Sequence, residues 1–313
     1  WAEAYEDAGG RYYPKLQVSV PFTPATGRRL LVRPGESASA VRGGLAAGLV
    51  ELTRLREASS VHVTFAPIEE WQLLGARGFL LRTDQQFHWE NRGYASFDEF
   101  LAALASRKRK AIKRERRDAL DGGVEIDLLT GSSILSVHWD AFFKFYMHTG
   151  SRKWGRPYLT RAFFNQIGTT LADRVLLVMA RRAGRYIAGA INFIGDDALY
   201  GRNWGAIEDR PFLHFEVCYY QAIDFALARG LKRIEAGAQG EHKLARGYRP
   251  ALTYSAHEFA DARLGTAVAD YLGHERAAVE RTIALYEEYA PFRRGEADAR
   301  RDERLGESFD TDV

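Results

Sequence analysis

The sequence predicts an α+β protein, and three observations carry this expectation. The chain has 313 residues and is 46% hydrophobic, so it can bury one large core or two moderate ones. Three apolar or alternating runs, Val175–Arg181, Arg185–Ile194 and Ala198–Trp204, are separated by short turns that contain glycine, which predicts an antiparallel meander. Apolar residues at helical spacing on either side of these runs predict helices around the meander.

The first 90 residues predict a shorter series of strands and helices. Apolar alternation favours the extended segments, and spacing of three to four residues favours the helices. The predicted elements are extended segments near Lys15–Phe22 and Arg29–Val32, a helix at Ala38–Ala58, a strand at Val61–Phe65, a helix at Ile68–Ala76 and a strand at Phe79–Trp89.

Residues 124 to 259 predict a longer series that contains the meander. A proline at 211 and a glycine at 230 bracket the helix that follows it. The other predicted elements are a strand at Val124–Leu129, helices at His138–Met147 and Arg161–Leu171, a strand at Leu231–Ala238, a loop at Gln239–Pro250, a strand at Leu252–Phe259 and a C-terminal helix at Val268–Tyr289. The order β, α, α, β, β, β, α, β, loop, β is that of the GNAT acyltransferase fold.

This order predicts two tandem GNAT-like units, with the first incomplete at its N-terminus. We place the partial first unit at residues 1–105, a basic connecting helix at 106–122, the second unit at 123–292 and a charged, mobile tail at 293–313. The sequence opens at Trp1 without an initiator methionine, which leaves its true N-terminus open.

Composition excludes several classes of protein. The chain has no run of 18 apolar residues and no signal peptide, and Cys218 is its single cysteine, so we expect no membrane insertion and no disulfide framework. The histidines show no paired ligand spacing, so no metal site is expected. We expect a cytoplasmic protein whose oligomeric state the sequence leaves open.

One stretch carries an unusual charge. Between Arg107 and Arg117 lie eight basic residues and one acid, while the whole chain has a formal net charge of only +3. Such a helix repels itself unless an anion such as phosphate or RNA lies beside it. The alternative is a solvated basic face paired with nearby carboxylates. As binding residues we single out Arg107, Arg109, Lys110 and Arg114.

Four segments resemble a known family. They are Phe97–Leu101 with Ser106–Arg116, Tyr200–Gly205, Leu213–Tyr220 and Glu235–Tyr248. They are similar to an uncharacterised bacterial family called FemAB-like or "peptidoglycan biosynthesis protein", a group of GNAT-type N-acyltransferases, over roughly Trp1 to Pro291. A weaker similarity reaches the Fem transferases, which move an amino acid from aminoacyl-tRNA onto the peptide of a peptidoglycan precursor. The resemblance implies a GNAT-type fold and an acyltransferase class.

The loop after the strand at 231–238 offers groups for this chemistry. N-acyl transfer needs a neutral amine, hence a base near the working pH, and donors for the developing oxyanion. His242 is the candidate base, with Glu241 as a second catalytic candidate. Lys243 and Arg246 would clamp a carboxylate or phosphate of the substrate. The alternative is that these are exposed loop charges around a packing histidine.

A second group lies at the end of the meander and the start of the next helix. Strand alternation puts Tyr200, Arg202 and Trp204 on one face, which suits an acyl or peptide substrate. His214 and Glu216 lie near the start of a helix, where free N–H groups favour an anion. Alternatively, the aromatic residues only pack, and Glu216 only complements the helix dipole. Cys218 as a nucleophile is a weaker alternative.

The acyl donor stays open between aminoacyl-tRNA and acyl-CoA. Ordinary acetyl-CoA enzymes of this fold have a glycine-rich pyrophosphate loop before the helix, whereas Ile207–Leu213 has no glycine and two acids. We expect no bound cofactor. The leading function is an N-acyl or aminoacyl transferase for a small or peptide amine, such as a cell-wall precursor. The alternatives are an RNA-binding module that uses the basic helix and a GNAT-like scaffold without chemistry.

Overall fold

A computed structural model describes residues 1–35, 37–153 and 157–293. The predicted mobility of the tail therefore lies almost entirely outside the described residues, as do residues 154–156 of the basic, aromatic segment Arg152–Tyr158, which the sequence predicts as a loop between two helices. The contacts divide the chain into two units: unit 1 consists of residues 1–86 and 250–288, and unit 2 of residues 87–249 and those from 289 onward. The fold is GNAT-like, as predicted, and the two units are described in turn.

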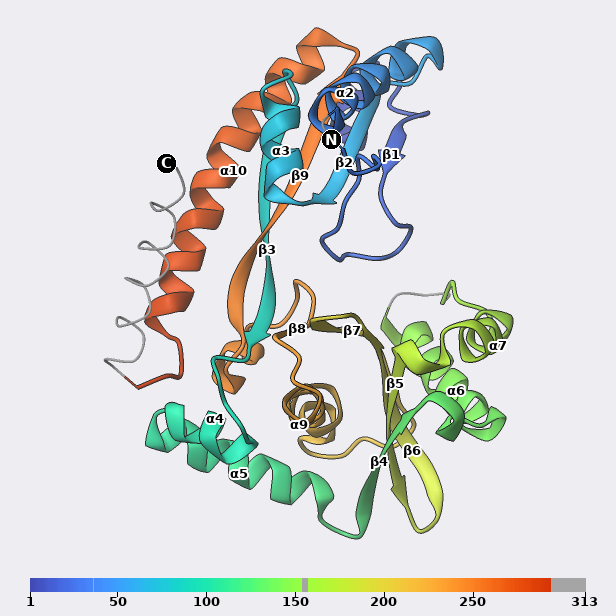
Figure 1. The fold of residues 1–313 in the computed structure, drawn as a ribbon, viewed down its shortest axis with the longest axis vertical. Helices are drawn as coiled ribbons and strands as arrows, with labels where there is room; N and C mark the ends of the chain where they lie inside the picture. Colours follow the sequence, from blue (N-terminus) through green and yellow to red (C-terminus); the bar gives the residue numbers. More distant parts are fainter. Residues whose placement is uncertain (36, 154–156, 294–313) are drawn as a thin grey trace. The chain divides into compact units, whose positions relative to one another are not determined.

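Unit 1 is a small sheet with four helices (Figure 1). Its strands lie in the order β1, β2, β9, β3. β1 is parallel to β2, and β9 is antiparallel to β2. Its elements are α1 (Ala2–Asp7), β1 (Leu16–Val18), α2 (Ala38–Leu55), β2 (Ser60–Ala66), α3 (Ile68–Gly75), most of β3 (Leu80–Glu90), most of β9 (Arg249–Phe259) and α10 (Ala262–Glu288). Apolar side chains such as Val61, Leu74 and Ala256 form its core.

The extended segment predicted at Arg29–Val32 does not form a strand of the sheet. The backbone N–H groups of Arg29 and Leu30 donate to the Glu70 carboxylate at 2.8 and 3.1 Å instead of joining a ladder. The Arg29 guanidinium also donates to the carbonyl of Thr64. A buried carboxylate on α3 satisfies these backbone groups, so the segment stays irregular.

Unit 2 contains the predicted meander. The order of its strands is β3, β8, β7, β6, β5, β4; β4 to β7 are antiparallel, and β8 is parallel to β7. Its elements are α4 (Phe97–Ala103), α5 (Ser106–Leu120), β4 (Val124–Thr130), η1 (Gly131–Ser133), α6 (Ser136–Lys153), α7 (Arg161–Thr170), η2 (Ala172–Arg174), β5 (Val175–Arg182), β6 (Arg185–Ile194), β7 (Ala198–Ala206), α8 (Leu213–Phe215), η3 (Glu216–Tyr220), α9 (Gln221–Ala228), β8 (Arg233–Glu235) and η4 (Glu241–Arg246).

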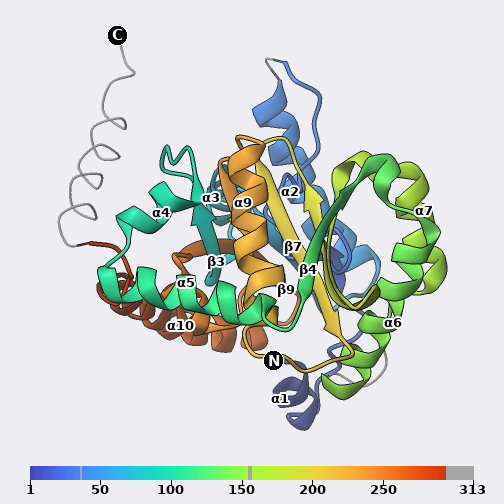
Figure 2. The ribbon, with the colours of Figure 1, turned by 90° about the horizontal axis from the view of Figure 1, so that it is seen from below.

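Helices cover both faces of this sheet. Figures 1 and 2 show α6 and α7 on one face of β4 to β7 and α9 on the other. Buried residues of α6 and α7, including Phe142, Phe145 and Phe164, pack on Val175, Leu177 and Met179 of β5. The apolar, β-branched character of β5 fits a strand that is buried on both faces.

The predicted domain boundaries differ from those of the structure. Residues 250–288 were assigned to the second unit, but β9 pairs with β2 from Ser60↔Phe259 to Thr64↔Ser255, and Arg82 of β3 pairs with Glu275 of α10 at 2.7 Å. Alternating apolar and polar residues indicate that a strand is buried on one face, but they do not indicate which strand it pairs with. The basic helix α5, predicted as a connector, belongs to unit 2.

Candidate functional site

A cavity of about 680 Å³ in unit 2 brings together several of the predicted residues. Arg202, Trp204, His214 and His242 all line it. It also receives side chains from the end of α6 and from Pro157 and Tyr158 before α7, the described end of the basic loop. Its volume is typical of a site for a small ligand.

A bulge in β7 aims three successive residues at this cavity. Ile191 of β6 pairs with Asn203, and Asn192 pairs with Gly201, so Arg202 is the extra residue. Arg202, Asn203 and Trp204 therefore all line the cavity, whereas strict alternation would turn Asn203 away. Tyr200, which alternation placed with Arg202, is not among the lining residues. A one-residue bulge leaves no clear mark in the sequence.

A close approach of α6 to β7 forms the neighbouring wall. A Cβ atom on Gly205 would lie 2.3 Å from the carbonyl oxygen of Phe145, so only glycine allows this contact. The contact brings Tyr146, Thr149 and Gly150 of α6 to the cavity. Thr149 Oγ1 accepts the backbone N–H of Ala206 at 3.2 Å, which ties the end of α6 to the end of β7.

A π-helical turn places the aromatic side of the cavity. The helix predicted at 211–230 contains the π-turn η3 between α8 and α9. The ring centroids of His214 and Tyr219 are 5.4 Å apart. The two residues are five positions apart in the chain, which is the repeat of a π-helical hydrogen bond. Tyr219 is largely buried, and it also lines the cavity. Such π-turns often occur at functional sites.

His242 and Tyr219 form a hydrogen-bonded pair on the cavity wall. Tyr219 Oη lies 3.0 Å from His242 Nε2. The His242 ring lies over Gly240, whose φ is +100°; a Cβ there would come within 2.5 Å of the ring. Gly240 is therefore needed both for its backbone conformation and for the close approach of the imidazole.

The surroundings shift both groups of this pair away from their charged forms. The pKa of His242 is below its ordinary value because of partial desolvation, then the charges of Arg246 and Lys243. Burial raises the pKa of Tyr219 well above its ordinary value. At neutral pH the pair therefore consists of a neutral imidazole and a protonated phenol.

Lys243, a predicted substrate clamp, holds the loop instead. Its side chain is only 4% exposed, and its ammonium donates to the carbonyls of Ala236 at 2.5 Å, Gly237 at 3.2 Å and Gln239. Burial lowers its pKa to about 8. Ala236 and Gln239 line the cavity, so Lys243 shapes the cavity wall without entering it.

Arg246 also lies outside the cavity and acts on the loop. Its guanidinium stacks on the Phe215 ring at 3.4 Å and donates to the His242 carbonyl at 2.7 Å. It donates as well to Glu115 Oε2 at 2.8 Å, and Tyr220 Oη donates to the same carboxylate oxygen. Glu115, the one acid in the basic run, thus connects α5 to the segment that carries His242.

Glu216, predicted as a binding residue, is a buried structural carboxylate. It is 0% exposed and accepts from Arg116 Nε and Nη2 at 3.1 and 3.0 Å and from Gln221 Nε2 at 2.6 Å. Burial raises its pKa, and the Arg116 charge opposes that rise. The ion pair fixes α5 to the π-turn and leaves Glu216 no access to the cavity.

The other predicted residues do not meet the cavity. Glu241 is exposed at the start of η4 and is not a lining residue, and Cys218 is not one either. Arg107, Lys110 and Arg114 are exposed and Arg109 is half-buried, and none of them lines the cavity. The basic helix and the cavity are therefore separate features of unit 2.

The polar groups of the cavity favour a ligand with an anionic part. None of the lining residues in the described part of the chain is acidic, and Arg202 supplies a permanent positive charge. Arg202 Nη2 donates to Tyr158 Oη at 2.8 Å. Asn203 Oδ1 is buried without a hydrogen-bond partner among the described residues, and its burial keeps it from contact with a ligand in the cavity.

The segment before α8 does not form a glycine cradle for a pyrophosphate. Glu208 there pairs with Arg182 and Arg185 at 3.0 and 2.8 Å. Phe212, rather than a glycine, takes the left-handed conformation with φ of 60°, and its carbonyl already accepts the N–H groups of Phe215 and Glu216. The residues present thus do not fit the usual coenzyme A pyrophosphate site.

Two other searches of residues 1–35, 37–153 and 157–293 gave simple results. No group of three or more His, Cys, Asp or Glu side chains in these ranges could hold a metal ion. None of the helices described is long and apolar enough to cross a membrane.

The fold and the cavity define an α+β protein of the GNAT-like class. The chain belongs to the FemAB-like family, described as peptidoglycan biosynthesis/recognition, whose model matches residues 1–294. Family and fold together support a transferase role. No curated protein matches the sequence.

Three solved structures are similar to this chain. L-PGS from Bacillus licheniformis has a TM-score of 0.54 at 9% identity, covering 75% of this chain and 77% of that one. FemX has a TM-score of 0.53 at 13% identity, covering 80% and 85%. The C-terminal domain of a putative lysylphosphatidylglycerol synthetase from Agrobacterium fabrum has a TM-score of 0.53 at 11% identity, covering 76% and 78%. At these identities the similarity shows the fold.

Proposed function

We propose that the chain is an N-acyltransferase that moves an aminoacyl group from aminoacyl-tRNA to an amine, in the cavity of unit 2. The observation that carries this proposal is the Tyr219–His242 pair on the cavity wall. Acyl transfer to an amine needs one group that accepts a proton and one that donates to the carbonyl oxygen. A neutral imidazole bonded to a protonated phenol supplies both.

The tautomer of His242 decides which atom does which task. When His242 Nε2 carries the proton, it donates to Tyr219 Oη, His242 Nδ1 is free to accept, and the phenol O–H is free to donate. The acceptor amine then attacks the ester carbonyl carbon of the donor, and a C–N bond forms while the C–O bond to the tRNA ribose breaks. The amine proton passes to His242 Nδ1 and from there to the departing ribose hydroxyl.

A further residue suits the substrates. Arg202 lines the cavity and suits a carboxylate or phosphate of the amine substrate, because its guanidinium is always charged and presents a planar fork of donors.

Two observations support aminoacyl-tRNA over acyl-CoA as the donor. Phe212 and the paired Glu208 replace the glycine-rich loop that a coenzyme A pyrophosphate needs. The family description points to peptidoglycan, and the matched fold includes FemX. We propose an amine of a cell-wall precursor peptide as the acceptor. Acyl-CoA remains the alternative donor in the assay below.

The test is product formation followed by mass spectrometry. Wild type is incubated with a lysine-containing precursor peptide and, separately, with several aminoacyl-tRNAs and several acyl-CoAs. We expect a peptide heavier by one aminoacyl residue with wild type and with His274→Gln, which removes an exposed histidine on α10. We expect little product with His242→Gln. If folded wild type gives no heavier product with any donor, the transferase proposal is wrong and the scaffold alternative stands.

A further inference from the structure

The exposed face of α5 keeps most of its positive charge unneutralised. Lys113 pairs with Asp98 at 3.1 Å and Arg117 with Asp118 at 2.8 Å, both in exposed positions. Within the described part of the chain, five further basic side chains of the run have no acidic partner within 4 Å. Arg107, Lys110 and Arg114 are exposed, and Lys108 and Arg109 are half-buried.

This arrangement opposes the intrinsic preferences of a helix. α5 has no acid in its first turn and no side-chain cap at Ala105. Basic residues near a helix N-terminus face the positive end of the helix dipole, which costs stability. Like charges three or four residues apart add to that cost. An anion on this face would offset both effects.

The exposed basic side chains of α5 lie in a stripe along the helix, and of those in the next sentence only Arg117 has an acidic partner. Arg107, Lys110, Arg114 and Arg117 follow one another at steps of three, four and three residues, and all four are exposed. They therefore lie on one face over about 15 Å, at 1.5 Å per residue. A linear polyanion matches such a stripe better than a compact anion does.

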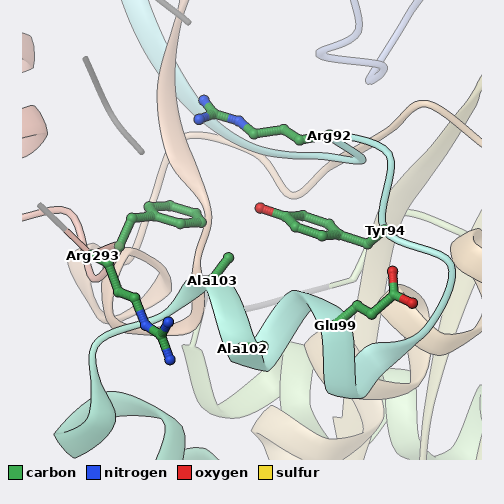
Figure 3. Close-up of a pocket in the computed structure, with 7 residues that line it drawn as sticks. Arg92, Tyr94, Glu99, Ala102, Ala103 and Arg293 are labelled. Atoms are coloured by element: carbon green, nitrogen blue, oxygen red, sulfur yellow. The ribbon is translucent and has the colours of Figure 1, made fainter. Parts of the chain in front are cut away.

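A small pocket lies at the start of the same helix (Figure 3). Its volume is about 260 Å³, and Arg92, Tyr94, Phe292 and Arg293 are among its lining residues. The backbone joins it to α5: Ala105 N donates to the Pro291 carbonyl at 2.8 Å, and Arg293 N donates to the Ala103 carbonyl at 3.1 Å. The pocket therefore adjoins the N-terminal end of the stripe.

The walls of the pocket suit a flat ring next to phosphates. Arg92 lies over the Phe292 ring with 5.5 Å between its guanidinium carbon and the ring centroid. Figure 3 shows Arg92 and the Tyr94 ring among the side chains that line the pocket. Glu99, the one acid in the lining, is occupied at the start of α4, where it accepts the Ala95 N–H at 2.9 Å. Aromatic rings and arginine planes are the groups on which proteins stack unpaired bases.

We propose that the α5 stripe and this pocket form an RNA-docking surface, with phosphates along the stripe and an unpaired base in the pocket. The inference deepens the proposed function and rests on it only in naming the RNA as that of the acyl donor. The surface lies apart from the cavity lining, as the RNA body of an aminoacyl-tRNA would require, since only its acylated end enters the site.

An anionic membrane is the competing partner, and the apolar residues disfavour it. Helices that lie on membranes combine basic residues with exposed large apolar side chains. Among the described residues, no exposed large hydrophobic side chain lies between Ile68 and Leu128, a range that contains all of α4 and α5. The face is basic without an apolar partner face, which is typical of binding to a nucleic-acid backbone.

The experiment measures RNA binding directly and does not depend on catalysis. A labelled RNA hairpin with a single-stranded 3′ end is titrated with the full chain at several salt concentrations, with anisotropy as the readout. The test variant is Arg107→Glu, Lys110→Glu, Arg114→Glu. The control variant is Arg28→Glu, Arg33→Glu, Arg56→Glu, which makes the same charge change at exposed sites in unit 1.

We expect binding by wild type that weakens steeply with salt. The test variant should bind at least about tenfold more weakly and with a shallower salt dependence, because about three phosphate contacts are lost. The control should bind nearly as wild type does. Phe292→Leu should weaken binding less than the stripe variant does and leave the salt dependence unchanged, since it removes stacking only.

The melting temperature of the test variant distinguishes a binding role of the α5 stripe from a structural role. The glutamate at position 107 lies in the first turn of α5 and complements the helix dipole, and all three substitutions remove repulsion between like charges, so the test variant should melt at the same temperature as wild type or higher. If wild type does not bind the hairpin, if both charge variants weaken it equally, or if the chain binds anionic vesicles instead, the RNA surface is wrong. Transfer from acyl-CoA would in that case still support the proposed chemistry.

Discussion

The two units each contain a pair of neighbouring histidines, and the pairs differ in what surrounds them. In unit 1, His62 of β2 and His257 of β9 lie opposite each other, both 4% exposed, with 2.7 Å between their Nδ1 atoms. In unit 2, the rings of His214 and His242 are 6.0 Å apart and both line the cavity. We call His62 and His257 the sealed pair, because both are buried, and His214 and His242 the open pair, because both line the cavity.

The sealed pair uses its nitrogens within the protein. His62 Nε2 lies 3.1 Å from Tyr12 Oη and 2.9 Å from Ser60 Oγ. His257 Nε2 is buried with no partner among the described residues, so the least costly arrangement leaves it unprotonated, with His257 Nδ1–H donating to His62. Burial lowers the pKa of His62 to about 4 and that of His257 to about 3.

The open pair has a nitrogen to spare, and this difference separates a structural histidine from a chemical one. His242 shares Nε2 with Tyr219 and keeps Nδ1 available. In the described part of the chain both units place aromatic and imidazole rings together. His214 and His242 line a cavity, whereas the cavity of about 690 Å³ in unit 1 is lined by Trp1 and not by His62 or His257. A histidine can exchange a proton with a ligand only where the ligand can reach it and where one ring nitrogen has a lone pair that is not used within the protein.

The largest expected effect is on catalysis by the open pair. His242→Gln should lower kcat/KM by about 100-fold or more, because general-base catalysis contributes about 10² to 10⁴. Thermal melting should change little, since the side chain is exposed. His257→Leu should do the reverse: kcat is retained, and the free energy of unfolding falls by about 1–3 kcal/mol because His62 loses its partner. If both variants lose activity in proportion to stability, the distinction fails.

The second effect is the response of the sealed pair to acid. Both folded-state pKa values lie below the unfolded value near 6.5, so the unfolded state binds more protons as the pH falls below about 6.5. Stability from this pair is therefore present above pH 6.5 and is lost as the pH falls toward 4. At about 1.4 kcal/mol per pH unit, the loss between pH 6.5 and 4 is on the order of 3 kcal/mol for each histidine. Urea unfolding at pH 7, 6, 5 and 4 measures it.

A double variant isolates this contribution. His62→Leu with His257→Leu removes both titrating rings and leaves neither imidazole unpaired. Its stability should change less between pH 7 and 4 than that of wild type. A variant curve parallel to the wild-type curve would show that other groups cause the acid loss.

Local patterns predicted most of the fold and part of the site. The meander strands at 175–206, the helices around them and the Ile68–Gly75 helix follow from periodicity, and all are present. Residues 250–288 were assigned to the second unit, whereas β9 pairs with β2 of unit 1, because the pattern of a strand does not indicate which strand it joins. Arg202, Trp204, His214 and His242 were predicted as site residues and share one cavity.

The missed residues depend on irregularities that periodicity ignores. Asn203 reaches the cavity through a bulge, and Tyr219 reaches it through a π-turn. Both irregularities insert one residue into a regular element, and no residue type signals them. Glu216, Lys243 and Arg246 were predicted as ligands from their charge, but each lies within a buried network that the sequence does not reveal.

A smaller effect is expected at Gly240, next to the open pair. Gly240→Ala would place a Cβ 2.5 Å from His242 Cε1 and strain a backbone with φ of +100°. We expect the imidazole to turn away from Tyr219, with a loss of about tenfold in kcat/KM, since a misplaced base costs about that much or more. Gly230→Ala, another glycine with positive φ but with open space for a Cβ, is the matched control. Equal losses of activity in both would contradict the packing argument.

The smallest effect is expected from the charge beside the open pair. Arg246 lowers the pKa of His242, so the neutral base persists to lower pH, and kcat/KM falls only below that pKa. Arg246→Gln combined with Glu115→Gln removes this charge without leaving a buried ion unpaired, and the acid limb of kcat/KM should move up by less than about one pH unit. Arg246→Lys keeps the charge but loses the donor fork to Glu115 and the His242 carbonyl, so the limb should stay in place while kcat falls a few-fold. If the double variant leaves the limb unmoved, then His242 is not the group that titrates in the reaction, and the open pair loses its distinguishing role.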